Sequence, residues 1–360
     1  MTPLRHALSD DHFAAIEPSL PPSGRPGHPW KDHRRVIDGI LWILHTGAPW
    51  RDLPRATYGP WQTVYERFNR WSKDGTWGRI LEALHARLDA QGKIDWELFC
   101  VDGSSVRASR SAAGASPTDG TAAEPSDHAL GRSRGGYGSK IHLVCDGKGL
   151  PMAVTVTAGQ RHESTQFEAV MGHVRVPRPA GRPRCRPRKL AGDKGYSYRR
   201  VRRYLRRRGI KAVIPTRKDQ RRLPSFDKPT YRRRDVVERC IGWLKESRRL
   251  ATRFEKLAEN FLAMVKLAML ERLLKALLPD TASAPTAPAI DAAPRSDAPR
   301  DAVQGTIASG AGGRYPSELC GRTVLYRTRY SSISTFASSS VSNTSPSSSS
   351  SRSFPSKLSM

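Results

Sequence analysis

Three carboxylates are the residues best able to do chemistry in this sequence. Asp102 ends the apolar run 95–102, Asp193 ends a second short run that begins at Lys189, and Glu238 lies within residues 231–245. Carboxylates are the hard oxygen ligands that Mg²⁺ prefers. Two such ions can activate an oxygen nucleophile and neutralise a phosphate during phosphodiester cleavage. The three acids are far apart in the chain, so only folding could bring them together.

The stretch YRRRDVVERCIGWLK, residues 231–245, predicts a helix with one polar stripe. At about 100° per residue, the stripe holds Tyr231, Arg234, Glu238 and Lys245, and Arg249 continues it. Apolar residues fill most of the other side, which indicates a buried face. An exposed helix face with charge pairs is the other interpretation, because Arg234 and Glu238 are spaced i,i+4.

The spacing Tyr-two-Arg-three-Glu-six-Lys resembles that of a known family. It resembles the DDE transposases of bacterial insertion sequences, specifically the insertion sequence five family, over about residues 12–278. The resemblance implies cleavage of DNA at terminal inverted repeats, followed by attack of the freed 3′-hydroxyl on target DNA. It also implies two Mg²⁺ ions, with Mn²⁺ as a substitute. The implied catalytic and metal-binding residues are Asp102, Asp193 and Glu238, and the implied DNA contacts are Tyr231, Arg234, Lys245 and Arg249.

The charge of the chain points to a polyanionic partner. It holds 61 Lys and Arg against 33 Asp and Glu, a net charge of +28. Nucleic acid is the usual partner of so basic a protein. With the resemblance, the expected partner is double-stranded DNA, both inverted-repeat ends and target DNA, bound by a homodimer or larger assembly. A basic surface that only aids solubility is the alternative.

Residues 1–92 predict a small helical domain. Apolar residues recur at helical spacing over 36–44, 61–71 and 77–88, with stops at Gly47 and at Asp74-Gly75. Three short helices with sharp turns suit a helix-turn-helix module. The stretches GILWILHTGAPWRDLP and YGPWQTVYERFNRW resemble the family's N-terminal DNA-binding domain. A three-helix bundle without DNA contacts remains the alternative.

Residues 93–278 predict an α/β catalytic domain. A strand ending at Asp102 is followed by a polar segment, 103–136, that we expect to be a flexible loop. Then come a hairpin around 146–149, a helix, a strand, a second helix, a strand and the Glu238 helix. This is the order of a ribonuclease-H-like mixed sheet flanked by helices. His162 either approaches the acids or bonds within its loop.

The remaining sequence carries fewer signals. The five cysteines lack CxxC spacing, which favours a reduced, cytosolic protein without a zinc site. The family resemblance implies a bacterial, nucleoid-associated location in the cytoplasm. The apolar run 261–278 holds four charged residues, too many for a membrane span, and no signal peptide is apparent in residues 1–15. Residues 279–360 are rich first in Ala and Pro and then in Ser, so we expect a low-complexity disordered tail.

Two other classes of function compete with an active transposase. One is an inactive or domesticated transposase that acts only as a sequence-specific DNA-binding protein. The other is a ribonuclease-H-like nuclease that does not transfer strands. The presence of all three acids argues against the first class, and the spacing around Glu238 argues against the second.

Overall fold

The computed structural model describes residues 6–22, 32–113, 128–221 and 225–279. The expected disordered tail lies outside these residues, apart from Pro279. Within the described part of the chain, no helix is both long enough and apolar enough to cross a membrane.

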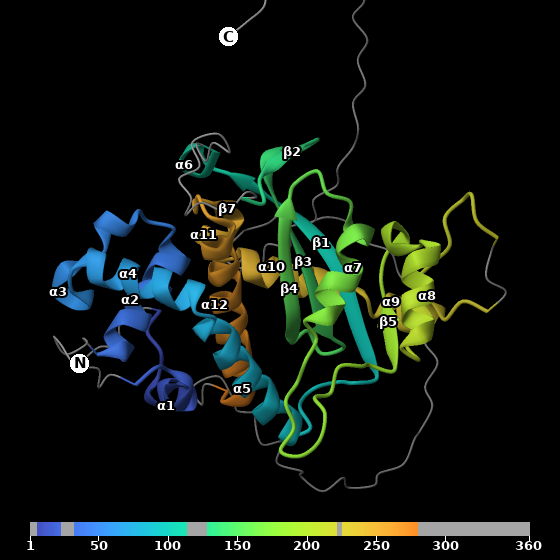
Figure 1. Ribbon diagram of the computed structural model, residues 1–360, viewed down its shortest axis with the longest axis horizontal. Coiled ribbons are helices and arrows are strands. Elements are labelled where there is room, and N and C mark those ends of the chain that lie inside the picture. Colours follow the sequence, from blue (N-terminus) through green and yellow to red (C-terminus); the bar gives the residue numbers. More distant parts are fainter. Residues whose placement is uncertain (1–5, 23–31, 114–127, 222–224, 280–360) are drawn as a thin grey trace, which may run out of the picture. The chain divides into compact units, whose positions relative to one another are not determined.

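The N-terminal region is helical, and its three predicted helices are confirmed as α2, α4 and α5 (Figure 1). Gly47 ends α2 with a φ of 71°, and Gly75 precedes α5 with a φ of 77°, a conformation that costs glycine nothing. The Trp71 ring is fully buried and meets the Trp77 ring edge-on at 5.3 Å, so these tryptophans form core. The elements are α1 (Asp10–Ile16), η1 (Glu17–Ser19), α2 (His33–Thr46), η2 (Trp50–Asp52), α3 (Arg55–Tyr58), α4 (Trp61–Lys73) and α5 (Thr76–Ala90).

A single mixed sheet forms the rest of the core, with its main strands in the order β4-β3-β1-β5-β6. β1, β3 and β4 are antiparallel neighbours, whereas β5 and β6 run parallel to β1. Parallel strands need crossover connections, and helices supply them. This topology is ribonuclease-H-like, as predicted. The strands are β1 (Leu98–Ala108), β2 (Gly131–Ser133), β3 (Gly136–Asp146), β4 (Pro151–Ala158), β5 (Lys189–Ala191), β6 (Lys211–Val213) and β7 (Thr252–Arg253).

The structure corrects the predicted loop at 103–136. β1 continues six residues beyond Asp102, so this acid lies inside the strand, and β1 is followed by α6 (Arg110–Ala113) and later by β2. Ladders to β3 and β7 hold the small polar residues of β1 in the strand. Arg253 is fully buried and donates to the carbonyls of His128 and Ala129, which anchors the chain before β2.

Helices cover the sheet and carry the remaining site residues. α7 packs on β3 and β4, α10 on β1 and β3, and α8 on β6. Their bounds are α7 (Glu163–Gly172), η3 (Lys194–Tyr196), α8 (Arg199–Arg207), α9 (Lys228–Arg232), α10 (Asp235–Lys245), α11 (Arg248–Ala251) and α12 (Ala258–Leu277).

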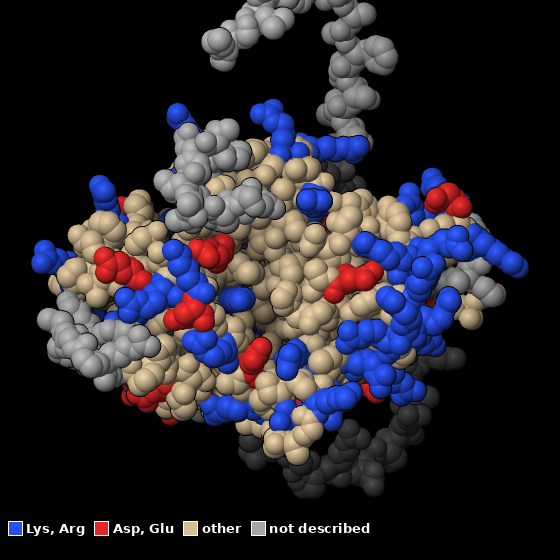
Figure 2. Space-filling model, in the orientation of Figure 1, with Lys and Arg blue, Asp and Glu red and all other residues tan. Residues whose placement is uncertain are grey.

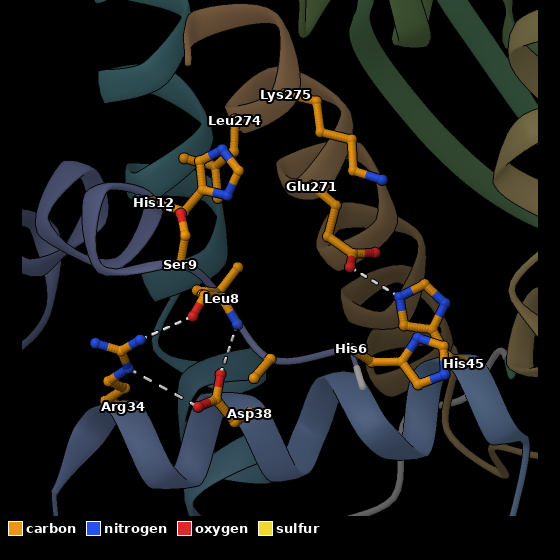
Figure 3. Close-up of a pocket in the computed structure, with 11 residues that line it drawn as sticks. His6, Leu8, Ser9, His12, Arg34, Asp38, His45, Glu271, Leu274 and Lys275 are labelled. Carbon is orange, nitrogen blue, oxygen red and sulfur yellow. Dashed lines mark hydrogen bonds and ion pairs between the residues drawn. The ribbon is translucent and has the colours of Figure 1, made fainter. Parts of the chain in front are cut away.

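The last of these helices, α12, packs against both α5 and β4 and joins the helical region to the sheet (Figure 1). Most of its residues are buried, and polar contacts hold its C-terminal half. His45 on α2 lies 2.8 Å from Glu271, and Lys93 donates to the carbonyls of Ala276 and Leu277. Figure 3 shows the His45–Glu271 pair at the edge of a cavity of about 560 Å³ lined by α1, α2 and α12. The helical region and the sheet therefore share one core.

We expect Leu270→Ala to lower the free energy of unfolding by about 2–5 kcal/mol, because Leu270 is 1% exposed in the middle of α12. Urea unfolding followed by circular dichroism measures the change. Leu262→Ala, at a half-buried position on the same helix, is the control and should cost less than half as much. Equal losses for the two variants would contradict the central placement of α12.

Candidate active site

The sheet register brings Asp102 and Asp193 together. Cys100 pairs with Ala191 across the parallel strands β1 and β5, and continuing this register by two residues places the two acids beside each other. Neighbouring strands lie about 4.8 Å apart. Each carboxylate accepts a backbone N–H at 2.8 Å, Asp102 from Gly103 and Asp193 from Gly195. The charge of Asp193 acts on Asp102, which agrees with this placement of the two predicted residues near each other.

Arg234 connects Asp102 to the third predicted acid. Its guanidinium donates to Asp102 at 3.1 Å and also pairs with Glu238 one turn along α10. The side chains of Asp102 and Arg234 are 18% and 16% exposed, whereas that of Glu238 is 57% exposed. Arg234 was predicted to contact DNA, but in this structure its charge is directed at the acids.

Burial and charge oppose each other at this pair. Burial raises the pKa of Asp102, while the Gly103 N–H and Arg234 act to lower it. Burial also acts to lower the pKa of Arg234, but Asp102 and Glu238 outweigh this effect and raise it. The guanidinium is thus held charged between two carboxylates.

A fourth acid, Glu163, lies at the start of α7 and was not among the predicted site residues. A Cβ atom added to Gly103 would lie 2.7 Å from Glu163 Cγ, so this side chain passes directly over β1. Lys140 on β3 pairs with Glu163 at 3.4 Å. Burial raises the pKa of Glu163, Lys140 lowers it, and the nearby Asp193 and Asp102 raise it further. The sequence did carry a signal for Glu163, because this acid follows a predicted strand and a short loop, much as Asp193 follows its strand.

His162, the residue singled out in this stretch, caps α7 instead. Its ring accepts the Ser164 N–H at 3.2 Å and meets the Tyr198 ring edge-on. The interpretation that His162 bonds within its loop is the one the structure supports.

Tyr196 is a buried residue close to the acids Asp102, Glu163 and Asp193. Its ring is 1% exposed, and its hydroxyl has no hydrogen-bond partner among the described residues. Burial raises the pKa of Tyr196 well above its ordinary value, and the charges of Glu163, Asp102 and Asp193 raise it further. The tyrosine therefore remains protonated and available as a donor.

The structure places the other predicted DNA contacts in different surroundings. The predicted helix is interrupted: α9 ends at Arg232 and α10 begins at Asp235, so Tyr231 lies on α9 with its ring against Phe226. Lys245 is half-buried and donates to the Ser105 carbonyl of β1 at 3.0 Å.

Arg249 does not extend the stripe, which corrects that prediction. It lies on α11 after a turn, is 5% exposed, and pairs with the buried Glu255 at 2.9 Å. Because both side chains are shielded from solvent, Arg249 in this position stabilises the fold and does not reach a phosphate.

The acids supply suitable metal ligands without forming a finished metal site. Among the described residues, no three His, Cys, Asp or Glu side chains are gathered closely enough to hold one metal ion. Arg234 lies between Asp102 and Glu238 and supplies positive charge there. The donors are carboxylate oxygens only, which suits Mg²⁺ or Mn²⁺ and not softer metals.

A sheet of this topology, with acids on β1, after β5 and on α10, defines a ribonuclease-H-like protein. Two family models match the chain: "Putative transposase of IS4/5 family" over residues 8–81 and "Transposase DDE domain" over residues 96–270. The chain belongs to the IS4/5 family of DDE transposases.

Curated relatives agree with this membership. The chain is 38% identical over 107 residues to the insertion element IS402 uncharacterized 16.2 kDa protein of Burkholderia cepacia, covering 28% of this chain and 73% of the relative. It is 37% identical over 131 residues to the "Putative transposase for insertion sequence element IS402" of the same species. That match covers 36% of this chain and spans 60% of the relative's length.

Solved structures show weaker similarity. The piggyBac transposase synaptic complex with hairpin DNA is 11% identical, with a TM-score of 0.37 over 74% of this chain and 75% of that chain. The Mos1 transposase paired-end complex with left transposon end is also 11% identical, with a TM-score of 0.20 over 65% of this chain and 85% of that chain.

We expect Asp102 and Arg234 to be energetically coupled. Arg234→Met leaves a buried carboxylate without its counter-charge and should lower the free energy of unfolding by about 1–3 kcal/mol. The double variant with Asp102→Asn should recover more than half of this loss, because an amide needs no counter-charge. Urea unfolding at pH 7 measures both. If the two losses simply added, the pair would not be coupled.

Proposed function

We propose that this protein is an active transposase, which cuts DNA at the terminal inverted repeats of an insertion sequence and joins the 3′-hydroxyl ends to target DNA. The observation that supports this proposal is that Asp102 on β1 lies near Asp193 and shares Arg234 with Glu238 of α10. The family membership supplies the reaction class.

The three predicted acids act as the ligands of two divalent metal ions. Asp102, Asp193 and Glu238 would hold Mg²⁺, which, when bound, activates the attacking oxygen and neutralises the phosphate. Glu163 on α7 lies beside these acids and is paired with Lys140. It therefore acts as a positioning residue that supports the metal-binding carboxylates. The Tyr196 hydroxyl stays protonated and serves as a hydrogen-bond donor beside the acids, not as a nucleophile.

The remaining polar residues hold DNA. Tyr231 and Arg234 approach the strand being cut, and Lys245 binds its phosphate as a point charge. The helices α2, α4 and α5 in residues 1–92 read the inverted repeats in the manner of a helix-turn-helix module. Two or more copies assemble on DNA in the bacterial cytoplasm.

We expect Asp102→Asn, Asp193→Asn and Glu238→Gln each to reduce Mg²⁺-dependent nicking of end DNA to background, because an amide is a poor metal ligand. End binding should be nearly unchanged. Glu163→Gln should lower nicking about 10–100-fold. Nicking is measured on supercoiled plasmid that carries the terminal inverted repeats of the element, once they are identified in the DNA that flanks the gene.

Asp95→Asn is the matched control, because Asp95 is also paired with an arginine, Arg233, at 3.0 Å. This variant should retain nicking. Substantial nicking by any of the three acid variants would remove that residue from the site. If the wild type bound end DNA but never nicked it, the protein would be a DNA-binding protein only.

We expect Lys245→Ala to weaken binding to end DNA and to reduce the slope of log affinity against log salt by about 0.9, the value for one phosphate contact. Fluorescence anisotropy between 50 and 200 mM salt measures the slope. Lys148→Ala is the control, since Lys148 also donates to a backbone carbonyl at 3.0 Å but lies in the β3–β4 turn. An unchanged slope for Lys245→Ala would disprove the phosphate contact.

A further inference from the structure

A second basic site lies away from the acids, at the opposite end of β5 and β6. A cavity of about 750 Å³ is bounded by the loop that leads into β5 and by the end of α8. Six of its eight lining residues are arginines and none is acidic; the arginines are Arg178, Arg182, Arg184, Arg186, Arg207 and Arg208. Figure 2 shows Lys and Arg side chains crowded over α8.

Backbone hydrogen bonds hold the loop in place. Val176 and Arg184 exchange two of them, at 2.9 and 2.8 Å, and the chain turns between them at Gly181, whose φ is 82°. Arg208 of the α8 end donates to the Cys185 carbonyl at 3.2 Å. The loop and the helix end are thus fastened together, and the cavity between them is a fixed feature.

Most of the positive charge in this cavity is not offset by acids. Arg184 lies 3.4 Å from Asp89. The guanidiniums of Arg186 and Arg208 donate only to carbonyl or hydroxyl oxygens. Within the described part of the chain, Arg178, Arg182 and Arg207 have no ion-pair or hydrogen-bond partner. Like charges gathered in a concave surface repel each other and attract a polyanion.

The cavity is separate from the candidate active site. β5 runs from Lys189 towards Asp193, so Asp193 follows the carboxyl end of β5, with Asp102 near it inside β1, whereas the arginines precede the amino ends of β5 and β6. The six residues from Arg188 to Asp193 are separated by five steps, which span up to about 17 Å when extended. At roughly 3.4 Å per base pair, a DNA duplex covers this distance in about five base pairs.

We propose that this arginine-lined cavity binds the phosphate backbone of duplex DNA, independently of sequence, several base pairs from the bond that is cut. Arginine forks match phosphate oxygens, and backbone contacts position DNA without reading bases. The inference rests on the proposed function only in taking DNA as the partner, and it requires no cleavage.

The test compares two triple variants with the same change in charge. Arg178→Gln, Arg182→Gln and Arg207→Gln remove the unpartnered cavity arginines. Arg199→Gln, Arg203→Gln and Arg206→Gln remove exposed α8 arginines that do not line the cavity. Binding of the full chain to 30-base-pair duplexes, one with the inverted repeat and one scrambled, is measured by fluorescence anisotropy between 50 and 200 mM salt.

In the cavity variant, the slope of log affinity against log salt should fall by about 2.7 on both duplexes, because three phosphate contacts of about 0.9 each are lost. In the control variant, the slope should fall by less than about 0.9, the value for one contact. Unchanged melting temperatures would show that both variants fold.

Equal slope changes for the two variants would overturn the proposal, because only total charge would then matter. A loss confined to the inverted-repeat duplex would also overturn it. Duplex RNA of the same length is measured in the same way, and a loss seen only with this RNA would overturn the proposal as well. If the wild type bound neither DNA duplex, the proposed function itself would fail, whereas normal binding by the cavity variant would reject this site alone.

Discussion

The repulsion between carboxylates held side by side is the constraint on which this structure depends. The register of β1 and β5 fixes Asp102 beside Asp193, and α7 brings Glu163 over the same strand. Like charges at such distances cannot all remain ionised without compensation. Arg234 and Lys140 supply it from two different elements. Under the proposed function, bound metal cations would take over this compensation from the protein's own positive charges.

The shared core explains how the helical region and the acids belong to one working unit. α10 carries Glu238 and packs on β1, while α11 packs on α2 and α12 packs on α5. The buried pair Arg249–Glu255 lies in this connection. Movement of the N-terminal helices would therefore be transmitted to the acid-bearing strand through packed side chains. Under the proposed function, this packing links recognition of a DNA end to the position of the acids.

Much of this arrangement could be predicted from the sequence, because it rests on local patterns. Apolar periodicity and positive-φ glycines mark α2, α4 and α5, and apolar runs mark β1, β3, β4 and β5. The remainder depends on tertiary contacts. The polar end of β1 is a strand only because β3 and β7 pair with it. Glu163 joins the acids only because Gly103 leaves room for it. Arg249 changes from a stripe residue to a buried one because the helix stops before it.

The position of α12 also bears on how the protein is made. This helix is the last described element to leave the ribosome, yet it packs on α5 and β4, which are synthesised long before it. Until residues 258–277 emerge, the apolar faces of both partners stay open to solvent and to chaperones. Folding of the two regions is therefore completed only after most of the chain has been translated. A nascent or prematurely terminated chain that ends before α12 would therefore lack a finished core.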